Sequence, residues 1–447
     1  MFTTRRDFLW WSTAVAAATA ACRRQTAPPP VAVTAPPDDE SAALRPGGAK
    51  TPSLEPDSAA PAFPELAGFC DGVPPIGDAE LGSRVENARR QARDRGYDGV
   101  LLEAGVSMRY FTGVRLWLSE RPVLLWIPVA GDVVWVPPAF EEGSLRERLP
   151  SGATVRGWQE HEGPYGHAAG LVRDTGARRG KVALDPVVRS FVSHGLAQAS
   201  PGTVFDPAAG VVEACRMRKS PTELAIMRRA NEATQASLRA AAGRLTEGMT
   251  QSEFRRIVRA AQTAAGLTDL WALVLFGPNA AFPHGTEQDR AATRGELILV
   301  DTGGELHGYQ SDITRSWALG SVRDELRRAW ETVRAAQDAA LTKMRPGARC
   351  SEADAAARSV LAAAGYGADY ERLTHRLGHG IGMQIHEHPY MVRGNDQVLA
   401  PGMTMSNEPG IYVPGSFGVR LEDIVAITED GHEVFGRRAP SFEVPFG

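Results

Sequence analysis

VDTGGELHGYQSDITRSW, residues 300–317, is the stretch that decides the fold. Asp301 ends an apolar, strand-like run, and Asp312 follows eleven residues later beside a second β-rich run. Further along the chain, Glu408 stands in SNEPGIY, and Glu422 follows fourteen residues later in VRLEDI. Four carboxylates that meet in one cleft would repel each other strongly unless cations neutralised them. Two divalent ions would balance their four negative charges, so the sequence predicts a dinuclear metal centre.

A histidine cluster accompanies these carboxylates. The segment ERLTHRLGHGIGMQIHEHPY (residues 371–390) holds His375, His379, His386 and His388 within fourteen residues. His375 and His379 have the spacing of a helical zinc site, but the glycines at 378, 380 and 382 break a helix there, which disfavours such a site. One imidazole with four carboxylates is a hard, oxygen-rich ligand set that suits Mn²⁺ or Co²⁺, and less often Zn²⁺.

Length and composition bound the remaining possibilities. The chain has 447 residues, which predicts two or three domains. Lys and Arg number 49 against 53 Asp and Glu, a net charge of −4 that argues against nucleic-acid partners and against a polybasic membrane-binding face. The four cysteines (Cys22, Cys70, Cys215 and Cys350) stand far apart, so neither a thiolate zinc site nor a dense disulfide framework is expected.

The first 78 residues have the composition of export and linker segments. Residues 1–22, MFTTRRDFLWWSTAVAAATAAC, show a basic start, an apolar stretch and small residues, and the pair Arg5 and Arg6 resembles a twin-arginine export signal. An ordinary secretory signal or a membrane anchor is the alternative. Cys22 resembles the acylation site of a bacterial lipoprotein, with simple cleavage as the alternative. Residues 23–78 are rich in Pro and Ala and predict a linker. We therefore expect an exported bacterial protein, periplasmic or anchored to the membrane as a lipoprotein.

Two folded regions are expected after the linker. In residues 79–213, a helical pattern at 83–96 precedes β-rich runs at 99–104, 122–129 and 132–138, which predicts an α/β domain. In residues 214–447, capping-box signatures predict helices that begin after Ser220 and Thr250, and Ser351 with Asp354 predicts a third. Strand-like runs at 296–301, 314–320 and 418–428 separate the helices, so this second region is predicted to be an α+β domain.

These motifs, in this order, resemble those of the pita-bread metallopeptidases, the family of methionine aminopeptidase, aminopeptidase P, prolidase and creatinase. MRYFTGVR (residues 108–115) and its surroundings resemble the N-terminal domain of the aminopeptidase P, prolidase and creatinase group. The resemblance spans about residues 80–447. It implies an α+β pita-bread catalytic domain preceded by an α/β creatinase-like N-terminal domain, and a homodimer.

The resemblance also implies roles for individual residues. It assigns the two metal ions to Asp301, Asp312, His379, Glu408 and Glu422. A hydroxide between the ions would be the nucleophile, and Glu408 would move its proton. The other catalytic candidates are His284 near the substrate amine, His386 at the scissile carbonyl oxygen, His375 in the same pocket and Arg420 as a charged partner. Tyr412 would add a hydroxyl group.

The activity implied is that of an Xaa-Pro aminopeptidase, a metallopeptidase that cleaves between an N-terminal residue and proline. Mn²⁺ is the first expectation for its two ions, and Co²⁺ and Zn²⁺ are the alternatives. Methionine aminopeptidase lacks the N-terminal domain and creatinase needs no metal, so both fit less well. Three readings stay open beside it: an Xaa-Pro dipeptidase (prolidase), a hydrolase of other amides or of organophosphate esters, and an inactive exported relative that binds peptides.

Overall fold

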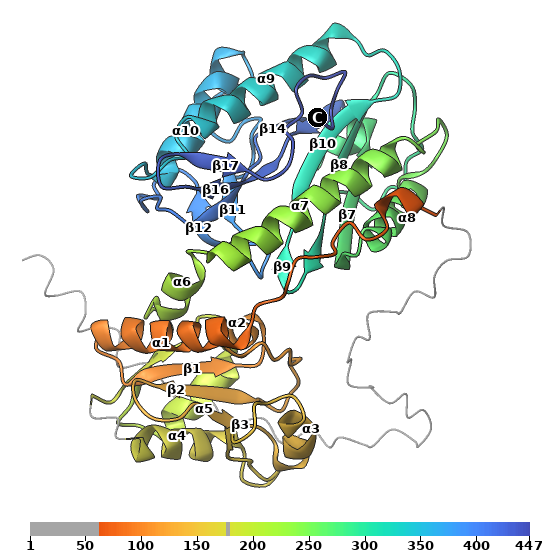
Figure 1. The fold of residues 1–447 in the computed structure, drawn as a ribbon. Coiled ribbons are helices and arrows are strands. Elements are labelled where there is room, and N and C mark those ends of the chain that lie inside the picture. The colour runs from red at the N-terminus through yellow and green to blue at the C-terminus, as the bar shows by residue number, and fades with distance from the viewer. Residues whose placement is uncertain (1–61, 176–178) are drawn as a thin grey trace, which may run out of the picture. The chain divides into compact units, whose positions relative to one another are not determined.

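The computed structural model describes residues 62–175 and 179–447, all of which fall within one compact unit, Leu54–Gly447. Its N-terminal half is an α/β layer built on one sheet, and its C-terminal half carries several smaller sheets and four long helices (Figure 1). The predicted order, an α/β region followed by an α+β region, is confirmed. The predicted export signal and Cys22 lie outside the described residues.

The N-terminal half is a six-stranded mixed sheet of order β4-β3-β2-β1-β5-β6. Its strands are β1 (Gly99–Glu103), β2 (Leu124–Pro128), β3 (Val134–Val136), β4 (Thr154–Val155), β5 (Lys181–Leu184) and β6 (Val204–Asp206). Its helices are α1 (Asp78–Asp94), α2 (Val106–Thr112), α3 (Glu142–Arg146), α4 (Pro164–Asp174), α5 (Ser190–Ala199) and α6 (Val211–Arg216), with short 3₁₀ turns at Pro64–Leu66 and Ala139–Glu141. Side chains alternate across β1, so Leu102 packs toward Ala88 of α1 while Leu101 packs toward α4 and α5.

The described part of the C-terminal half consists of four long helices and three sheets. The helices are α7 (Pro221–Ala242), α8 (Gln251–Ala264), α9 (Asp324–Leu341) and α10 (Cys350–Ala363), with a 3₁₀ turn at Gly277–Ala281. The first sheet consists of β7 (Thr268–Phe276), β8 (Leu297–Leu306), β9 (Tyr309–Gln310) and β10 (Ile313–Ala318). The second consists of β11 (Gly378–Gly380), β12 (Glu387–Met391), β13 (Thr404–Asn407), β16 (Asp423–Ile427) and β17 (His432–Val434). The third pairs β14 (Gly410–Val413) with β15 (Phe417–Arg420). Helix α7 runs along the first sheet and packs on β8 (Figure 1).

Two of the three predicted helix starts are confirmed. The Ser220 hydroxyl accepts from the Glu223 N–H at 3.1 Å, and the Glu223 carboxylate accepts from the Ser220 N–H at 2.7 Å, a capping box that begins α7. Thr250 begins α8 in the same way. The third is wrong: α10 begins one residue before Ser351, at Cys350, and its capping residue is Arg349.

Two further segments differ from expectation. The run at 418–428 is not one strand, because β15 ends at Arg420 and β16 begins at Asp423 in a different sheet. The break between them leaves Glu422 in a short link. Residues 62–78, expected to be the end of the linker, belong to the folded unit, since Phe63 and Leu66 are buried and the Cys70 N–H donates to Ala265 O. The predicted boundary between residues 213 and 214 falls within α6.

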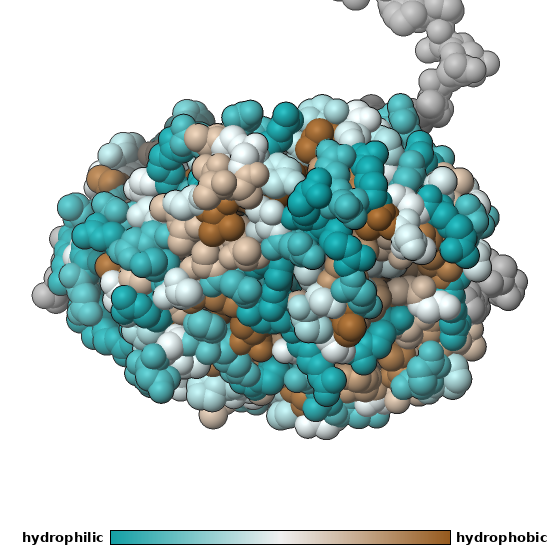
Figure 2. All heavy atoms as spheres, turned by 90° about the horizontal axis from the view of Figure 1, so that it is seen from above, coloured by the Kyte–Doolittle hydropathy of each residue, from teal (hydrophilic) through white to brown (hydrophobic). Residues whose placement is uncertain are grey.

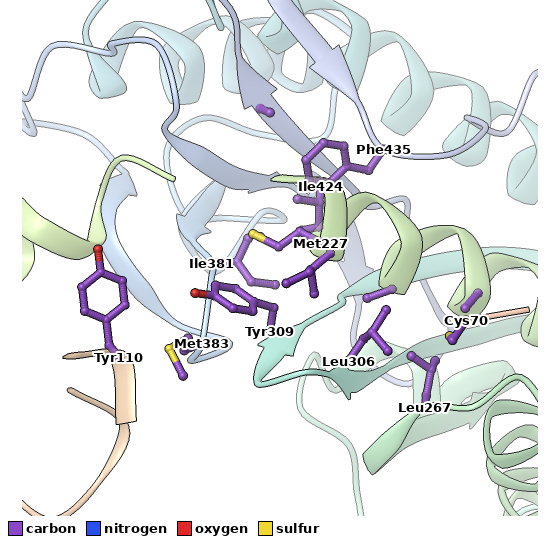
Figure 3. Packing of buried hydrophobic residues seen from close by; sticks show 14 of the residues in the cluster. Cys70, Tyr110, Met227, Leu267, Leu306, Tyr309, Ile381, Met383, Ile424 and Phe435 are labelled. Carbon is purple, nitrogen blue, oxygen red and sulfur yellow. The ribbon is translucent and has the colours of Figure 1, made fainter. Parts of the chain in front are cut away.

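The main hydrophobic cluster extends through both halves. Figure 3 shows Met227 of α7 packed with Ile381 and Tyr309, next to the strand ends that carry the candidate site residues. On the face in Figure 2, hydrophilic residues predominate and hydrophobic residues lie in separate spots. None of the described helices has the length and hydrophobicity that a bilayer crossing would need.

Candidate metal centre

Three of the five predicted ligands meet in a buried cluster. Ligand atoms of Asp312, His379 and Glu422 lie within 4.8 Å of one another. Asp312 lies between β9 and β10, His379 lies on β11, and Glu422 lies in the link between β15 and β16. Each residue thus comes from a strand or strand end in a different part of the chain.

The other two predicted ligands lie beside this cluster. Glu408 follows β13, and its Oε1 lies 3.2 Å from His379 Nε2. Asp301 lies on β8 opposite Thr314 of β10, whose hydroxyl donates to Glu422 Oε2 at 2.6 Å. The structure therefore brings all five predicted ligands into one neighbourhood.

Three carboxylate oxygens of this cluster lack protein donors. Asp301 Oδ1, Asp312 Oδ1 and Glu422 Oε1 are buried and accept no hydrogen bond from any described residue. Burial, together with repulsion from the neighbouring carboxylates, raises the pKa of Asp312 and of Glu422 well above the ordinary carboxyl value. Buried oxygens without partners are rare, and several that converge need a cation or protons. The donor set therefore fits divalent cations.

The orientation of His379 leads to the same conclusion. Its Nδ1 lies 3.1 Å from the backbone oxygen of Gly380, which can only accept, so Nδ1 carries a proton. Its Nε2 faces two carboxylate oxygens, at 3.6 Å from Asp312 and 3.2 Å from Glu408. A metal ion or a proton must stand between these acceptors. A backbone partner that fixes the ring of a ligating histidine is common in metal sites.

Close backbone packing holds β11 in place. A Cβ added to Gly378 would lie 2.1 Å from Ser406 O, and one added to Gly380 would lie 2.4 Å from His388 O. Only glycine fits at either position, because a Cβ would collide with the backbone of a neighbouring segment. Ser406 also donates its hydroxyl hydrogen to Glu408 Oε1 at 3.1 Å. The residue that packs against the strand of His379 therefore also orients Glu408.

Hydrogen bonds connect His375 through Tyr412 to Arg420. Arg420 Nη1 donates to the Tyr412 hydroxyl at 2.9 Å, and Arg420 Nη2 donates to Asp301 Oδ2 at 2.6 Å. His375 Nδ1 lies 2.7 Å from Arg376 O, so Nδ1 donates, and Nε2 accepts from the Tyr412 hydroxyl at 2.8 Å. Burial lowers the pKa of His375 to about 4, so the ring is neutral at pH 7. Both ring nitrogens have protein partners, which makes His375 a support for Tyr412 and Arg420.

The other two predicted histidines lie at the exposed rim. The ring of His386 packs edge-on against His379, with centroids 4.2 Å apart. Partial burial, His379 and the charge of Arg376 lower the pKa of His386 to about 4, so it is neutral at pH 7 and has an N–H to donate. His284 is exposed after the turn at Gly277–Ala281. Neither His284 nor His386 has a hydrogen-bond partner for its ring among the described residues, so both are free to contact a ligand.

Sequence reasoning missed the residues that hold Glu422. Thr314 binds Glu422 and also accepts from Arg420 Nε at 3.0 Å. Arg315 Nη1 donates to Glu422 O, and Arg315 Nη2 donates to Asp423, both at 2.6 Å. Thr314 lies two residues after Asp312 on β10, so the two-residue period of a strand could have placed it on the same face. No local signal identifies the Arg315–Asp423 pair, because its members are 108 residues apart.

Comparison with known proteins follows the same division of the chain. Residues 225–429 match the model of metallopeptidase family M24, and residues 84–218 match the creatinase/prolidase N-terminal domain. An Xaa-Pro dipeptidase of Lactobacillus delbrueckii subsp. lactis is 31% identical over 366 residues, which cover 80% of this chain and 98% of that protein. The chain belongs to metallopeptidase family M24. It is a hydrolase with a pita-bread catalytic domain and a creatinase-like N-terminal domain, as the motifs implied.

Solved structures of M24 relatives cover the same region. The crystal structure of dipeptidase PepE from Mycobacterium ulcerans has a TM-score of 0.77 and 33% identity, and covers 82% of this chain and 98% of that one. The X-Pro aminopeptidase of Thermotoga maritima has a TM-score of 0.65 and 26% identity, and covers 77% of this chain and 97% of that one. The relatives named as dipeptidases are the more similar, which favours the alternative reading of the sequence over the aminopeptidase that we expected first.

Proposed function

We propose that this metallopeptidase is an Xaa-Pro dipeptidase, which hydrolyses the bond between an N-terminal residue and a C-terminal proline. The proposed cofactor is a pair of divalent ions, Mn²⁺ in the first place, with Co²⁺ and Zn²⁺ as alternatives. The proposed ligands are Asp301, Asp312, His379, Glu408 and Glu422. The observation that carries the proposal is the cluster of buried carboxylate oxygens without donors beside His379 Nε2. The similarity to proteins named as dipeptidases supports the choice of substrate.

The ions would act as Lewis acids that polarise the scissile carbonyl and lower the pKa of water. Glu408 has one oxygen held by Ser406, and its Oε2 has no partner among the described residues. Burial opposes ionisation of Glu408, but the hydrogen bond with His379 and the charge of Arg420 lower its pKa to about 2. Glu408 is therefore ionised at pH 7, and its Oε2 would accept a proton from the attacking water.

His386 and His284 would contact the substrate. A neutral His386 can donate its ring N–H to the scissile carbonyl oxygen, and this donation strengthens as that oxygen gains charge. His284 would receive the N-terminal side of the peptide. Proline after the scissile bond brings no N–H, so the site need not satisfy a donor at that position.

Arg376 supports a dipeptide over a longer peptide. Its guanidinium lies over the ring of Tyr390, at 4.3 Å from the centroid, and forms no ion pair with any described carboxylate. Its charge acts on His386, which supports the proposal of a cation without an ion-pair partner close to the scissile carbonyl. The C-terminal carboxylate of an Xaa-Pro dipeptide is one residue from that carbonyl, so it would complete an ion pair with Arg376.

The test compares peptide lengths. The full chain, loaded separately with Mn²⁺, Co²⁺ and Zn²⁺, is given Xaa-Pro dipeptides and the matching Xaa-Pro-Yaa tripeptides, and products are separated by chromatography. We expect a higher kcat/KM for the dipeptides and no activity in Glu408→Ala. A preference for tripeptides would replace the proposal with the Xaa-Pro aminopeptidase. Binding without hydrolysis would indicate the inactive relative.

Export of the protein is a separate proposal. It rests on residues 1–22, with their Arg pair and Cys22, and the expected homodimer rests on the family resemblance alone. Expression in a bacterium with and without a functional twin-arginine pathway, followed by cell fractionation, tests the route. Mass spectrometry of the mature N-terminus distinguishes a lipid on Cys22 from simple cleavage. Light scattering of the purified protein tests the dimer.

A further inference from the structure

His386 lies in a loop whose own contacts are few. Residues 381–386 connect β11 to β12, which begins at Glu387, and within them the Gly382 N–H donates to Gln384 O at 3.1 Å. The ring of His386 has a ring contact with His379 but no hydrogen bond with a described residue. Something other than His386 itself must therefore hold this loop against the metal cluster.

Glu387 is the buried anchor of this loop. Its Oε1 accepts from the backbone N–H of Gln384 at 2.9 Å and from Arg216 Nη2 at 2.5 Å. Its Oε2 lies 3.3 Å from Lys219 Nζ. Because Glu387 directly follows His386, these contacts restrain the backbone that carries the imidazole.

Arg216 connects this anchor to the N-terminal half. It ends α6, and its Nη1 donates to the Ser107 hydroxyl of α2 at 3.1 Å, while its Nη2 also donates to the Gln384 side chain at 2.9 Å. Arg216 therefore contacts the loop at two residues and the N-terminal half at a third. A cavity of about 250 Å³ is lined by Arg216, His386 and Glu387, together with Asp185 from the N-terminal half.

The charges of this group are buried, which makes the arrangement informative. The side chains of Arg216, Lys219 and Glu387 are 9%, 1% and 6% exposed. Buried ion pairs are weak stabilisers, because the desolvation of the charges offsets their attraction, and apolar residues of similar size often serve stability as well. Such a pair instead fixes the positions of the segments that carry it. In this protein it fixes the loop that precedes Glu387.

We propose that Arg216 and Glu387 are positioning residues for His386, and that they hold its ring where it meets the substrate carbonyl. The inference rests on the proposed function in that it assigns His386 to the substrate. The ion pair spans 171 residues and joins α6 to the His386 loop, so it makes the active site depend on the segment between the two halves.

A kinetic cycle on the Mn²⁺-loaded enzyme with an Xaa-Pro dipeptide tests this inference. We expect Glu387→Gln to lower kcat by about tenfold or more and to change KM less than about twofold, as for the loss of an interaction made in the transition state. In a His386→Ala background the same change should lower kcat by less than about twofold, because the group it positions is gone. An equal loss in both backgrounds would overturn the proposal.

Arg109→Met is the matched control. Arg109 of α2 forms a similar ion pair with Glu305 of β8, at 2.9 Å, and its side chain has no hydrogen bond or ion pair with a described residue of the His386 loop. It should leave kcat within about twofold of the wild type. A loss of kcat equal to that of Glu387→Gln would mean that any ion pair between the halves suffices, and would overturn the specific role. Arg216→Lys keeps the charge without the forked geometry and serves if Glu387→Gln does not fold.

A second readout does not depend on activity. In metal-free protein with ¹³C-labelled histidine, the His386 ring signal is assigned by its loss in His386→Ala. We expect Glu387→Gln or Arg216→Lys to move this signal toward the position of free histidine, and Arg109→Met to leave it in place. An unmoved signal overturns the positioning role. If the signal moves but no Xaa-Pro peptide is hydrolysed, the positioning role stands and the proposed function fails.

Discussion

Removal of one carboxylate from the candidate metal centre should have opposite effects with and without metal. Asp312 is fully surrounded by protein, and its oxygens lie within 4.8 Å of the ligand atoms of Glu422 and His379. At that separation and an effective dielectric constant of about 20, two unit negative charges repel by about 3 kcal/mol. Without metal, Asp312→Asn should therefore raise the free energy of unfolding by about 1 to 3 kcal/mol at pH 8.

The pH dependence gives the sign of this effect. The pKa values of Asp312 and Glu422 are raised in the folded protein, chiefly by burial and next by neighbouring carboxylates. Their contribution to stability is fully present below the unfolded-state value of about 4 and is lost as pH rises through the raised values. The metal-free wild type should lose stability over that range, and Asp312→Asn should lose less.

The assay is urea unfolding followed by circular dichroism, in a chelator and in excess Mn²⁺. Metal at about a thousand times its Kd stabilises the wild type by about 4 kcal/mol, and the variant should gain much less. Asp423→Asn is the matched control, because Asp423 is equally buried but paired with Arg315 at 2.6 Å. It should destabilise in both buffers, since it leaves Arg315 without its charge partner. If Asp312→Asn also destabilises in chelator, the reasoning about uncompensated charge is wrong.

Three further results are expected. Arg376→Ala should raise KM for an Xaa-Pro dipeptide by about tenfold or more, and it should leave the KM of a C-terminally amidated analogue unchanged. Steady-state kinetics measures both values, and equal effects on the two substrates would exclude a contact between Arg376 and the substrate carboxylate. Ser220→Ala should lower the free energy of unfolding by about 1 to 2 kcal/mol in urea, more than Thr250→Ala at the exposed cap of α8, because the Ser220 hydroxyl also donates to Glu80 at 2.7 Å. Burial opposes ionisation of Glu387, but Arg216 and Lys219 lower its pKa to about 2. About 3 kcal/mol of stability should therefore be lost as the pH falls from 4.5 to 2. In the same urea assay, the stability of Glu387→Gln should depend less on pH over this range.

Local signals in the sequence identify the elements well. The capping boxes at Ser220 and Thr250 involve residues three apart, so they can be recognised without knowledge of the fold. The strand-like run at 296–301 overlaps β8, which begins at Leu297 and continues five residues beyond the run, where Gly303 and Gly304 pack closely against other segments of the fold. The start of α9 at Asp324 was missed because Arg323, its capping residue, makes no side-chain cap.

The candidate site was predictable as a set of residues but not as an arrangement. Asp301, Asp312, His379, Glu408 and Glu422 stand in recognisable motifs. The contacts that orient them join distant segments: Arg420 and Asp301 are 119 residues apart, and Thr314 and Glu422 are 108 apart. Such pairs are set by how the sheets pack, which no local pattern records. For this reason the sequence placed His375 among the catalytic residues, whereas both of its ring nitrogens bind protein groups.

Arginines of the N-terminal half form ion pairs with buried glutamates of the C-terminal half, and these pairs indicate what the N-terminal half does. Arg84 of α1 lies 3.4 Å from Glu223 of α7, and Arg109 of α2 binds Glu305 of β8. Glu223 and Glu305 are both buried, so loss of their arginines would leave uncompensated charges inside the catalytic half, and each such charge destabilises by about 3 to 5 kcal/mol. The proposed metal ligands all come from the C-terminal half, yet that half is electrostatically incomplete alone. The N-terminal half thus stabilises the catalytic half from which the site is built, before any contact with substrate is considered.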